Sequence, residues 1–284
     1  MNRISISQAW AYTTSFFSDQ HPNHAIALIG VGVAVPTLLN LLLGGAAVMD
    51  PAMMASGAAS MAAMGGTMFL LGIIGFLLQL ASYFASWRMG LVPGQENVGS
   101  ALGYGLVASL PVLLITIGFV LVFGIIFALL FGGSMMPLLM GGGAPTDSQA
   151  LGSLGMVFLA LPVFLAAALW LSARFCVMAP VMAANRSYNP LTALGESWRM
   201  TAASQWKIMG YFVLIAIVIG IISMIFGVVF GISMMAGNEP GSGAIAMVTI
   251  VGALVGIPVA YLYVGIPAGI YKALGGGNTS EVFA

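Results

Sequence analysis

Residues 208–235 read IMGYFVLIAIVIGIISMIFGVVFGISMM, a stretch that contains no charged side chain. A helix rises about 1.5 Å per residue, so roughly 20 apolar residues cross the hydrocarbon core of a bilayer. The stretch is too long and too evenly apolar for a barrel strand, and a helix satisfies its own backbone hydrogen bonds in lipid. It therefore predicts a transmembrane helix.

Five further stretches have the same character. The chain is 61% apolar and only 5% charged, whereas about a quarter of a soluble domain is charged. We therefore predict an all-α polytopic membrane protein with six transmembrane helices, in a single integral membrane domain over residues 1–284. The other five spans are expected at residues 25–48, 65–87, 106–131, 151–178 and 244–271.

The charged residues orient these spans. If the spans alternate across the membrane, every basic residue falls on one side, and the loops on the other side carry only Asp50, Asp147 and Glu239. The positive-inside rule then places both termini in the cytoplasm of a bacterial cell, with the helices in the inner membrane. The first apolar stretch begins too late and runs too long for a cleavable signal, so we expect no segment to be removed. The basic residues are Arg3, Arg88, Arg174, Arg186, Arg199, Lys207 and Lys272.

A short segment of intermediate polarity precedes each odd-numbered span. Ala9, Ala101 and Ala193 occupy equivalent places in these segments and are 92 residues apart. The constant spacing predicts three pseudo-repeats, each made of a short interfacial amphipathic helix, a span, an outer loop and a second span. Their approximate bounds are 1–92, 93–184 and 185–284.

The third copy shows the interfacial helix most clearly. Asn189 can cap a helix that begins at Pro190, and Leu191 and Trp198 then share an apolar face with Leu194 and Ala202. Such a helix is expected to lie in the cytoplasmic interface with its aromatic side chain at headgroup depth. The segment of the second copy contains three glycines and has the weakest helix propensity. The residues that we expect to contact lipid at this interface are Trp10, Arg186, Trp198, Arg199, Trp206 and Lys207.

Two sequence blocks of the third copy resemble a known family. Residues 189–201 read NPLTALGESWRMT, residues 205–210 read QWKIMG, and the opening ISISQAW at residues 4–10 is also similar. These blocks resemble the membrane-domain family of glycerophosphoryl diester phosphodiesterase and the YciC-like bacterial inner-membrane proteins. The resemblance implies a polytopic membrane domain. It implies no activity, because a catalytic barrel takes about 250 residues and the spans occupy this chain.

Packing and transport are alternative roles for the polar and small residues in the spans. No predicted span carries a charge at its centre, and Asn40 and Gln79 are the strongest intramembrane polar candidates. Their amides can join helices or line a solute path, and we favour the first role. Small residues four apart, such as Gly252 and Gly256 before Ala260, predict close helix packing.

Two groups of residues raise the question of metal binding. Asp19, His21 and His24 could hold zinc, but no fourth ligand is nearby, so we favour a polar entry into the first span. Methionines crowd the outer loops, and thioethers select Cu(I), although methionine is also a common packing residue. We therefore predict neither a metal nor another cofactor. These methionines are Met49, Met53, Met54, Met61, Met64, Met68, Met135, Met136, Met140, Met234 and Met235.

The composition limits the function classes. Seven Lys and Arg residues are too few for a nucleic-acid surface. The chain offers no nucleophile with an adjacent base and orienting acid, so we expect no enzymatic activity. We predict a non-enzymatic inner-membrane protein whose partners are membrane lipids and other membrane proteins. A component of a small-solute or ion transporter or channel is the alternative.

Overall fold

The computed structural model describes residues 4–18, 21–44, 58–94, 96–139, 162–235 and 242–276. Every regular element in these ranges is a helix, which confirms the predicted all-α class. Residues 162–175 are also helical. The labelled elements are α1 (Ile6–Ser15), α2 (His21–Ala25), η1 (Ile26–Ala34), α3 (Val35–Leu39), η2 (Asn40–Gly44), α6 (Ala58–Leu91), α7 (Val98–Leu139), α9 (Met178–Asn185), α10 (Pro190–Thr201), α11 (Gln205–Met235) and α12 (Ser242–Ala273).

The described helices supply five to six candidate membrane spans. Five are long and apolar enough to cross a bilayer without a sharp bend. A sixth candidate consists of α10 together with the first part of α11, which meet at a bend of 99°. These helices make the chain an integral membrane protein. The five are His21–Leu43, Phe69–Leu91, Val98–Ala128, Pro162–Asn185 and Ile250–Ala273.

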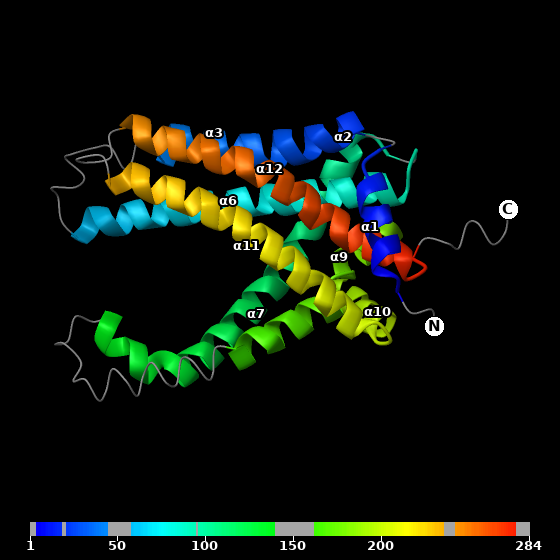
Figure 1. Ribbon diagram of the computed structural model, residues 1–284. Coiled ribbons are helices and arrows are strands. Elements are labelled where there is room, and N and C mark those ends of the chain that lie inside the picture. Colours follow the sequence, from blue (N-terminus) through cyan, green and yellow to red (C-terminus); the bar gives the residue numbers. More distant parts are fainter. Residues whose placement is uncertain are drawn as a thin grey trace.

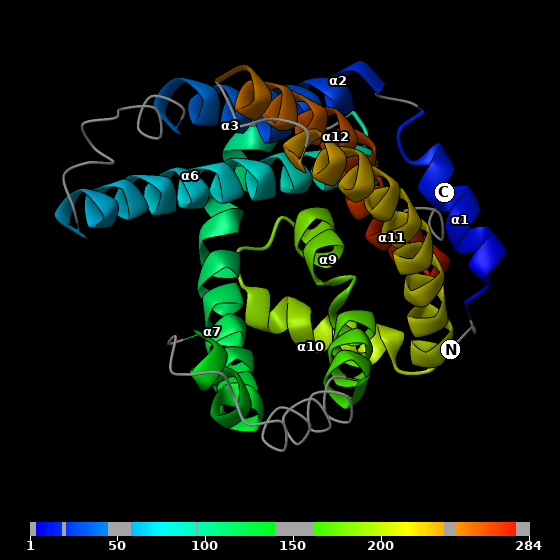
Figure 2. The ribbon, with the colours of Figure 1, turned by 60° about the vertical axis from the view of Figure 1, so that its left-hand side comes forward.

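The helices converge at one end of the molecule. Figure 1 shows α1, α9 and α10 gathered at this end. We call it the convergent end. From there, α6, α11 and α12 run as one group with the helices of residues 21–44. The helix α7 and residues 162–175 run as a second group. Figure 2 confirms that the two groups diverge away from the convergent end.

Burial follows this arrangement. The main cluster of buried apolar side chains includes Phe84 and Trp87 near the end of α6, Val181 in α9 and Val264 in α12. Apolar side chains farther along the long helices are exposed, as shown by Leu114 in α7 at 71% and Val163 at 70%. Because so many large apolar side chains face outward, lipid is the solvent that suits these surfaces.

Close helix contacts occur at glycines other than those singled out from the sequence. A Cβ on Gly105 of α7 would collide with the backbone oxygen of Ala81 in α6. A Cβ on Gly269 of α12 would lie 2.5 Å from the backbone oxygen of Ala9 in α1. Among the described residues, nothing lies within 4 Å of such a Cβ on Gly252 or Gly256, so the close packing predicted for this pair is not seen there. Close approach requires a partner helix, and four-residue spacing alone does not supply one.

The short helix predicted for the second pseudo-repeat is not a separate element. Residues 98–105, in the place predicted for it, form the start of the continuous helix α7. Asn97 caps this start, because its Oδ1 accepts a hydrogen bond from the Ser100 amide at 2.8 Å. The close approach of Gly105 to α6 explains why glycine is tolerated in this first part of the helix despite its low helix propensity.

Gly105→Ala should destabilise the crossing of α6 and α7 by about 1–3 kcal/mol, because the added methyl group has no room. Gly103→Ala is the matched control in the same helix, since nothing lies within 4 Å of its Cβ position. The free energy of unfolding, measured by titration with SDS, should fall only for Gly105→Ala. Equal stability of the two variants would contradict the described crossing.

Candidate functional site

The short helix α9 ends at a left-handed residue. Arg186 follows the helix with φ of 50°, and its amide donates to the Ala183 carbonyl at 3.4 Å. The amide of Ser187 donates to the Met182 carbonyl at 3.0 Å. This pair of bonds is the Schellman arrangement, which turns the chain sharply at the end of a helix.

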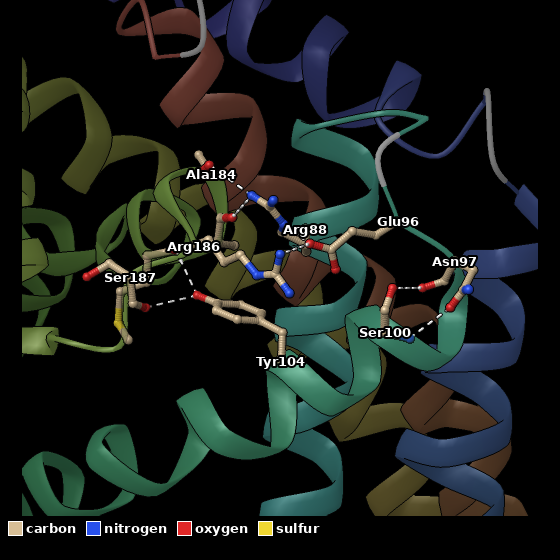
Figure 3. A network of polar contacts seen from close by, with 10 residues as sticks. Arg88, Glu96, Asn97, Ser100, Tyr104, Ala184, Arg186 and Ser187 are labelled. Atoms are coloured by element: carbon tan, nitrogen blue, oxygen red, sulfur yellow. Dashed lines mark hydrogen bonds and ion pairs between the residues drawn. The ribbon is translucent and has the colours of Figure 1, made fainter.

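Arg88, near the end of α6, caps the same helix terminus from outside. Its Nη1 donates to the carbonyls of Ala183 at 2.9 Å and Ala184 at 3.0 Å (Figure 3). The last carbonyls of a helix have no donor within the helix, and they carry the negative end of its dipole. A guanidinium is therefore well suited to this position, and it joins α6 to α9.

Glu96 balances the charge of Arg88. Its Oε1 lies 2.9 Å from Arg88 Nε and 3.6 Å from Arg186 Nη1 (Figure 3). The side chains of Arg88 and Glu96 are 7% and 6% exposed, whereas that of Arg186 is 56% exposed. The pair of Arg88 and Glu96 is therefore enclosed, and the contact with Arg186 lies at its rim.

Tyr104 completes the junction from α7. Its hydroxyl lies 2.8 Å from the Met182 carbonyl and 3.0 Å from the Ser187 carbonyl, so its single proton can be donated to either. The ring is buried, with Phe84 of α6 against it. The consecutive helices α6 and α7 are thus fixed by polar contacts around the end of α9, which lies farther along the chain, and we call this site the α9 junction.

A second buried arginine lies beside α10. Arg174 is 4% exposed, and its guanidinium carbon lies 3.9 Å from the centre of the Trp198 ring. Its carbonyl accepts hydrogen bonds from Ser197 Oγ at 2.8 Å and Thr201 Oγ1 at 3.2 Å. In contrast, Nε and Nη1 of Arg174 are enclosed and have no hydrogen-bond partner among the described residues.

The face of α10 that carries small side chains is buried. Ala193, Ser197 and Thr201 are buried, whereas Leu191 is 69% exposed and Trp198 is 38% exposed. Asn189 caps the helix as predicted, since its Oδ1 accepts from the amides of Leu191 and Thr192. The apolar stripe predicted from the sequence therefore lies on the outer surface of the protein.

The other expected interfacial residues are also exposed. Trp10 of α1 is 46% exposed and Trp206 of α11 is 66% exposed, and Arg199 lies on the surface of α10. Lys207 is exposed along much of its length, but its Nζ donates to the Ile4 carbonyl at 3.2 Å. The Ile4 amide donates to Ser204 Oγ at 3.1 Å, so the N-terminal segment is held against the bend between α10 and α11.

The two intramembrane amides bond within their own helices. Asn40 Nδ2 donates to the Pro36 carbonyl at 2.9 Å, and Gln79 Nε2 donates to the Tyr83 hydroxyl at 2.8 Å. Neither contact joins two helices. Pro36 cannot donate a backbone hydrogen bond, which loosens the helix around it, and the Asn40 side chain supplies a donor in the next turn.

Of the three residues considered for zinc, only His21 and His24 lie in the described part of the chain. His24 is fully buried. The centre of its ring lies 5.4 Å from that of Phe16 and 5.1 Å from that of Phe17. Asp19 lies outside the described residues, as do Met49, Met53, Met54 and Met140. The described residues contain no group of three His, Cys, Asp or Glu side chains placed to hold a metal ion.

The partners of both buried arginines are not among the contacts predicted from the sequence. Arg88 and Arg174 are predicted only as cations that orient the spans, although Arg174 falls inside the predicted span 151–178 and is enclosed in the structure. One available signal was the short distance in sequence between Arg88, at the end of an apolar stretch, and Glu96. The partnership with α9 carried no local signal, because 95 residues separate Arg88 from Ala183.

Comparison with known proteins identifies one family. Residues 149–265 match the model of the membrane domain of glycerophosphoryl diester phosphodiesterase. The match confirms the resemblance for the part of the chain that holds α9, α10, α11 and most of α12. No curated protein and no solved structure matches the chain.

Arg88→Met should lower the free energy of unfolding by about 3–5 kcal/mol, because it leaves the enclosed Glu96 carboxylate without its main partner. The double variant Arg88→Met with Glu96→Gln should recover part of that loss. Arg186→Gln is the control, and we expect roughly 0–1 kcal/mol for this exposed contact. Titration with SDS measures all three, and additive losses in the double variant would contradict the coupling.

Proposed function

We propose that this chain is a non-enzymatic, multi-pass protein of a bacterial inner membrane that acts through lipid or partner contacts at its cytoplasmic end. We identify the convergent end of the bundle as its cytoplasmic end. The match over residues 149–265 supports a membrane domain, and we infer no catalytic activity from the family name.

The distribution of basic residues is the observation that carries this proposal. All six basic residues in the described ranges lie at or next to the helix ends that meet at the convergent end (Figure 1). Cytoplasmic surfaces of membrane proteins are rich in Lys and Arg, and the lipids that they face are anionic. These residues are Arg88, Arg174, Arg186, Arg199, Lys207 and Lys272.

Exposed tryptophans support the same placement. Trp10, Trp198 and Trp206 belong to α1, α10 and the start of α11, and all three are exposed. Tryptophan favours the boundary between lipid tails and water, because its ring is apolar and its N–H is polar. We infer that α1 and α10 lie along this boundary, with the outer apolar stripe of α10 against lipid.

The threefold repeat is part of the proposal. In the first and third copies, the short helices α1 and α10 precede a long apolar helical stretch, and in the second copy the equivalent residues open α7. We infer that the three copies place three equivalent segments at one membrane surface. The direct continuation of residues 98–105 into α7 makes the second copy the most divergent of the three.

Charge reversal at the convergent end should weaken the preference for anionic lipid. In nanodiscs that contain phosphatidylglycerol and phosphatidylcholine, the wild-type protein should retain phosphatidylglycerol in its lipid shell. Arg199→Glu with Lys207→Glu should reduce that enrichment, because each basic residue near the surface contributes about 1 kcal/mol. Arg199→Lys keeps the charge and is the control. Quantifying the co-purified lipid checks the prediction, and equal enrichment in all variants would refute a charge-based contact.

A further inference from the structure

The guanidinium of Arg174 is a buried cation without an acceptor in the described structure. Its side chain is 4% exposed, and its Nε and Nη1 are enclosed without a hydrogen-bond partner. Burying a charged group without hydrogen bonds is costly, typically by several kcal/mol. The other enclosed arginine, Arg88, has a carboxylate and two carbonyls within hydrogen-bond distance. Of these two enclosed arginines, only Arg174 therefore lacks an acceptor in the described structure.

The contact with Trp198 does not use the N–H donors of Arg174. The guanidinium carbon lies 3.9 Å from the ring centre, so the ring covers one face of the planar group. The N–H bonds of a guanidinium lie in its plane and point outward from its edge. An arginine can therefore stack on an aromatic ring and still present a two-pronged edge to an oxyanion.

The surroundings hold this edge in place. Ser197 and Thr201 both donate to the Arg174 carbonyl, which fixes the arginine backbone against α10. The Trp170 ring packs edge-on against Trp198 at 5.4 Å, and its Nε1 donates to Gln205 Oε1 at 3.3 Å. The stack is therefore supported on several sides. Trp198 is itself 38% exposed, so the ring under the guanidinium reaches the surface of the protein.

We propose that Arg174 binds a phosphate group, with Trp198 as the ring on which its guanidinium is held. The missing acceptor is an oxyanion, and the planar donors of a guanidinium match the oxygens of phosphate. This inference rests on the proposed function for the source of the anion, because a basic and aromatic membrane surface meets lipid phosphates. Entry of the phosphate requires the side chains that enclose Nε and Nη1 of Arg174 to shift.

The test uses the full-length protein in a maltoside detergent, which contains no phosphate. Calorimetric titration with dihexanoyl phosphatidic acid should show one saturable site, and a parallel titration uses inorganic phosphate. Binding of both probes identifies phosphate as the recognised group, whereas binding of the first alone assigns the site to a lipid headgroup. Absence of saturable binding to both probes would overturn the inference.

Substitutions assign the site to Arg174. Arg174→Gln should weaken binding by at least about tenfold, and Arg174→Lys should also weaken it, because lysine keeps the charge but loses the planar pair of donors. Trp198→Leu leaves Arg174 in place and should weaken binding by removing its support. Thr192→Ala is the matched control on the exposed surface of α10 and should bind as the wild-type protein does. If Arg174→Gln does not fold, Arg174→Lys and Trp198→Leu provide the comparison.

The outcomes separate this inference from the proposed function. Wild-type affinity in the variants of Arg174 and Trp198 would overturn the phosphate site, even if the exposed cations Arg199 and Lys207 still govern lipid enrichment. Conversely, loss of phosphate binding in Arg174→Gln would support the site even if reversal of those exposed cations leaves the lipid shell unchanged. In the second case the proposed charge-based surface contact fails and the site stands.

Discussion

The outward faces of the long helices carry large apolar side chains, and lipid is the medium in which such faces are stable. Side chains such as Leu114 and Val163 are mostly exposed, and they lie on the two helices that diverge from the rest of the bundle. A backbone in lipid has to satisfy its own hydrogen bonds, so these segments are helical along their whole length. The open arrangement of the helices is consistent with lipid as the surrounding medium.

Polar contacts concentrate where the helices converge. The α9 junction joins α6, α7 and α9 through Arg88, Glu96 and Tyr104, and all three side chains bond to one another or to the terminus of α9. In the hydrophobic core of a membrane, apolar packing is not driven by the exclusion of water. Defined polar contacts and close glycine approaches, such as Gly105 against Ala81, therefore fix the relative positions of the helices.

The sequence predicted the helices better than their partners. Length and uniform apolarity predict a helix over 208–235, which α11 covers, and the cap at Asn189 follows from residue type and the adjacent proline. The contact between Arg88 and Ala183 could not be predicted, because it depends on how distant helices meet. The same reason applies to Gly252 and Gly256, which have the spacing of a small-residue ridge but open space at their Cβ positions among the described residues. Counting the charges in the sequence identifies Arg174 as a cation, but it does not predict that Arg174 is buried.

The orientation of the convergent end is the central claim of the proposed function, and cysteine labelling in spheroplasts tests it directly. Cys176→Ser removes the only cysteine, and Thr192→Cys or Ser148→Cys then introduces a single one in α10 or in the loop expected on the opposite side. A membrane-impermeant maleimide should label Ser148→Cys in intact spheroplasts and Thr192→Cys only after permeabilisation. Labelling of Thr192→Cys in intact spheroplasts would contradict the proposed orientation.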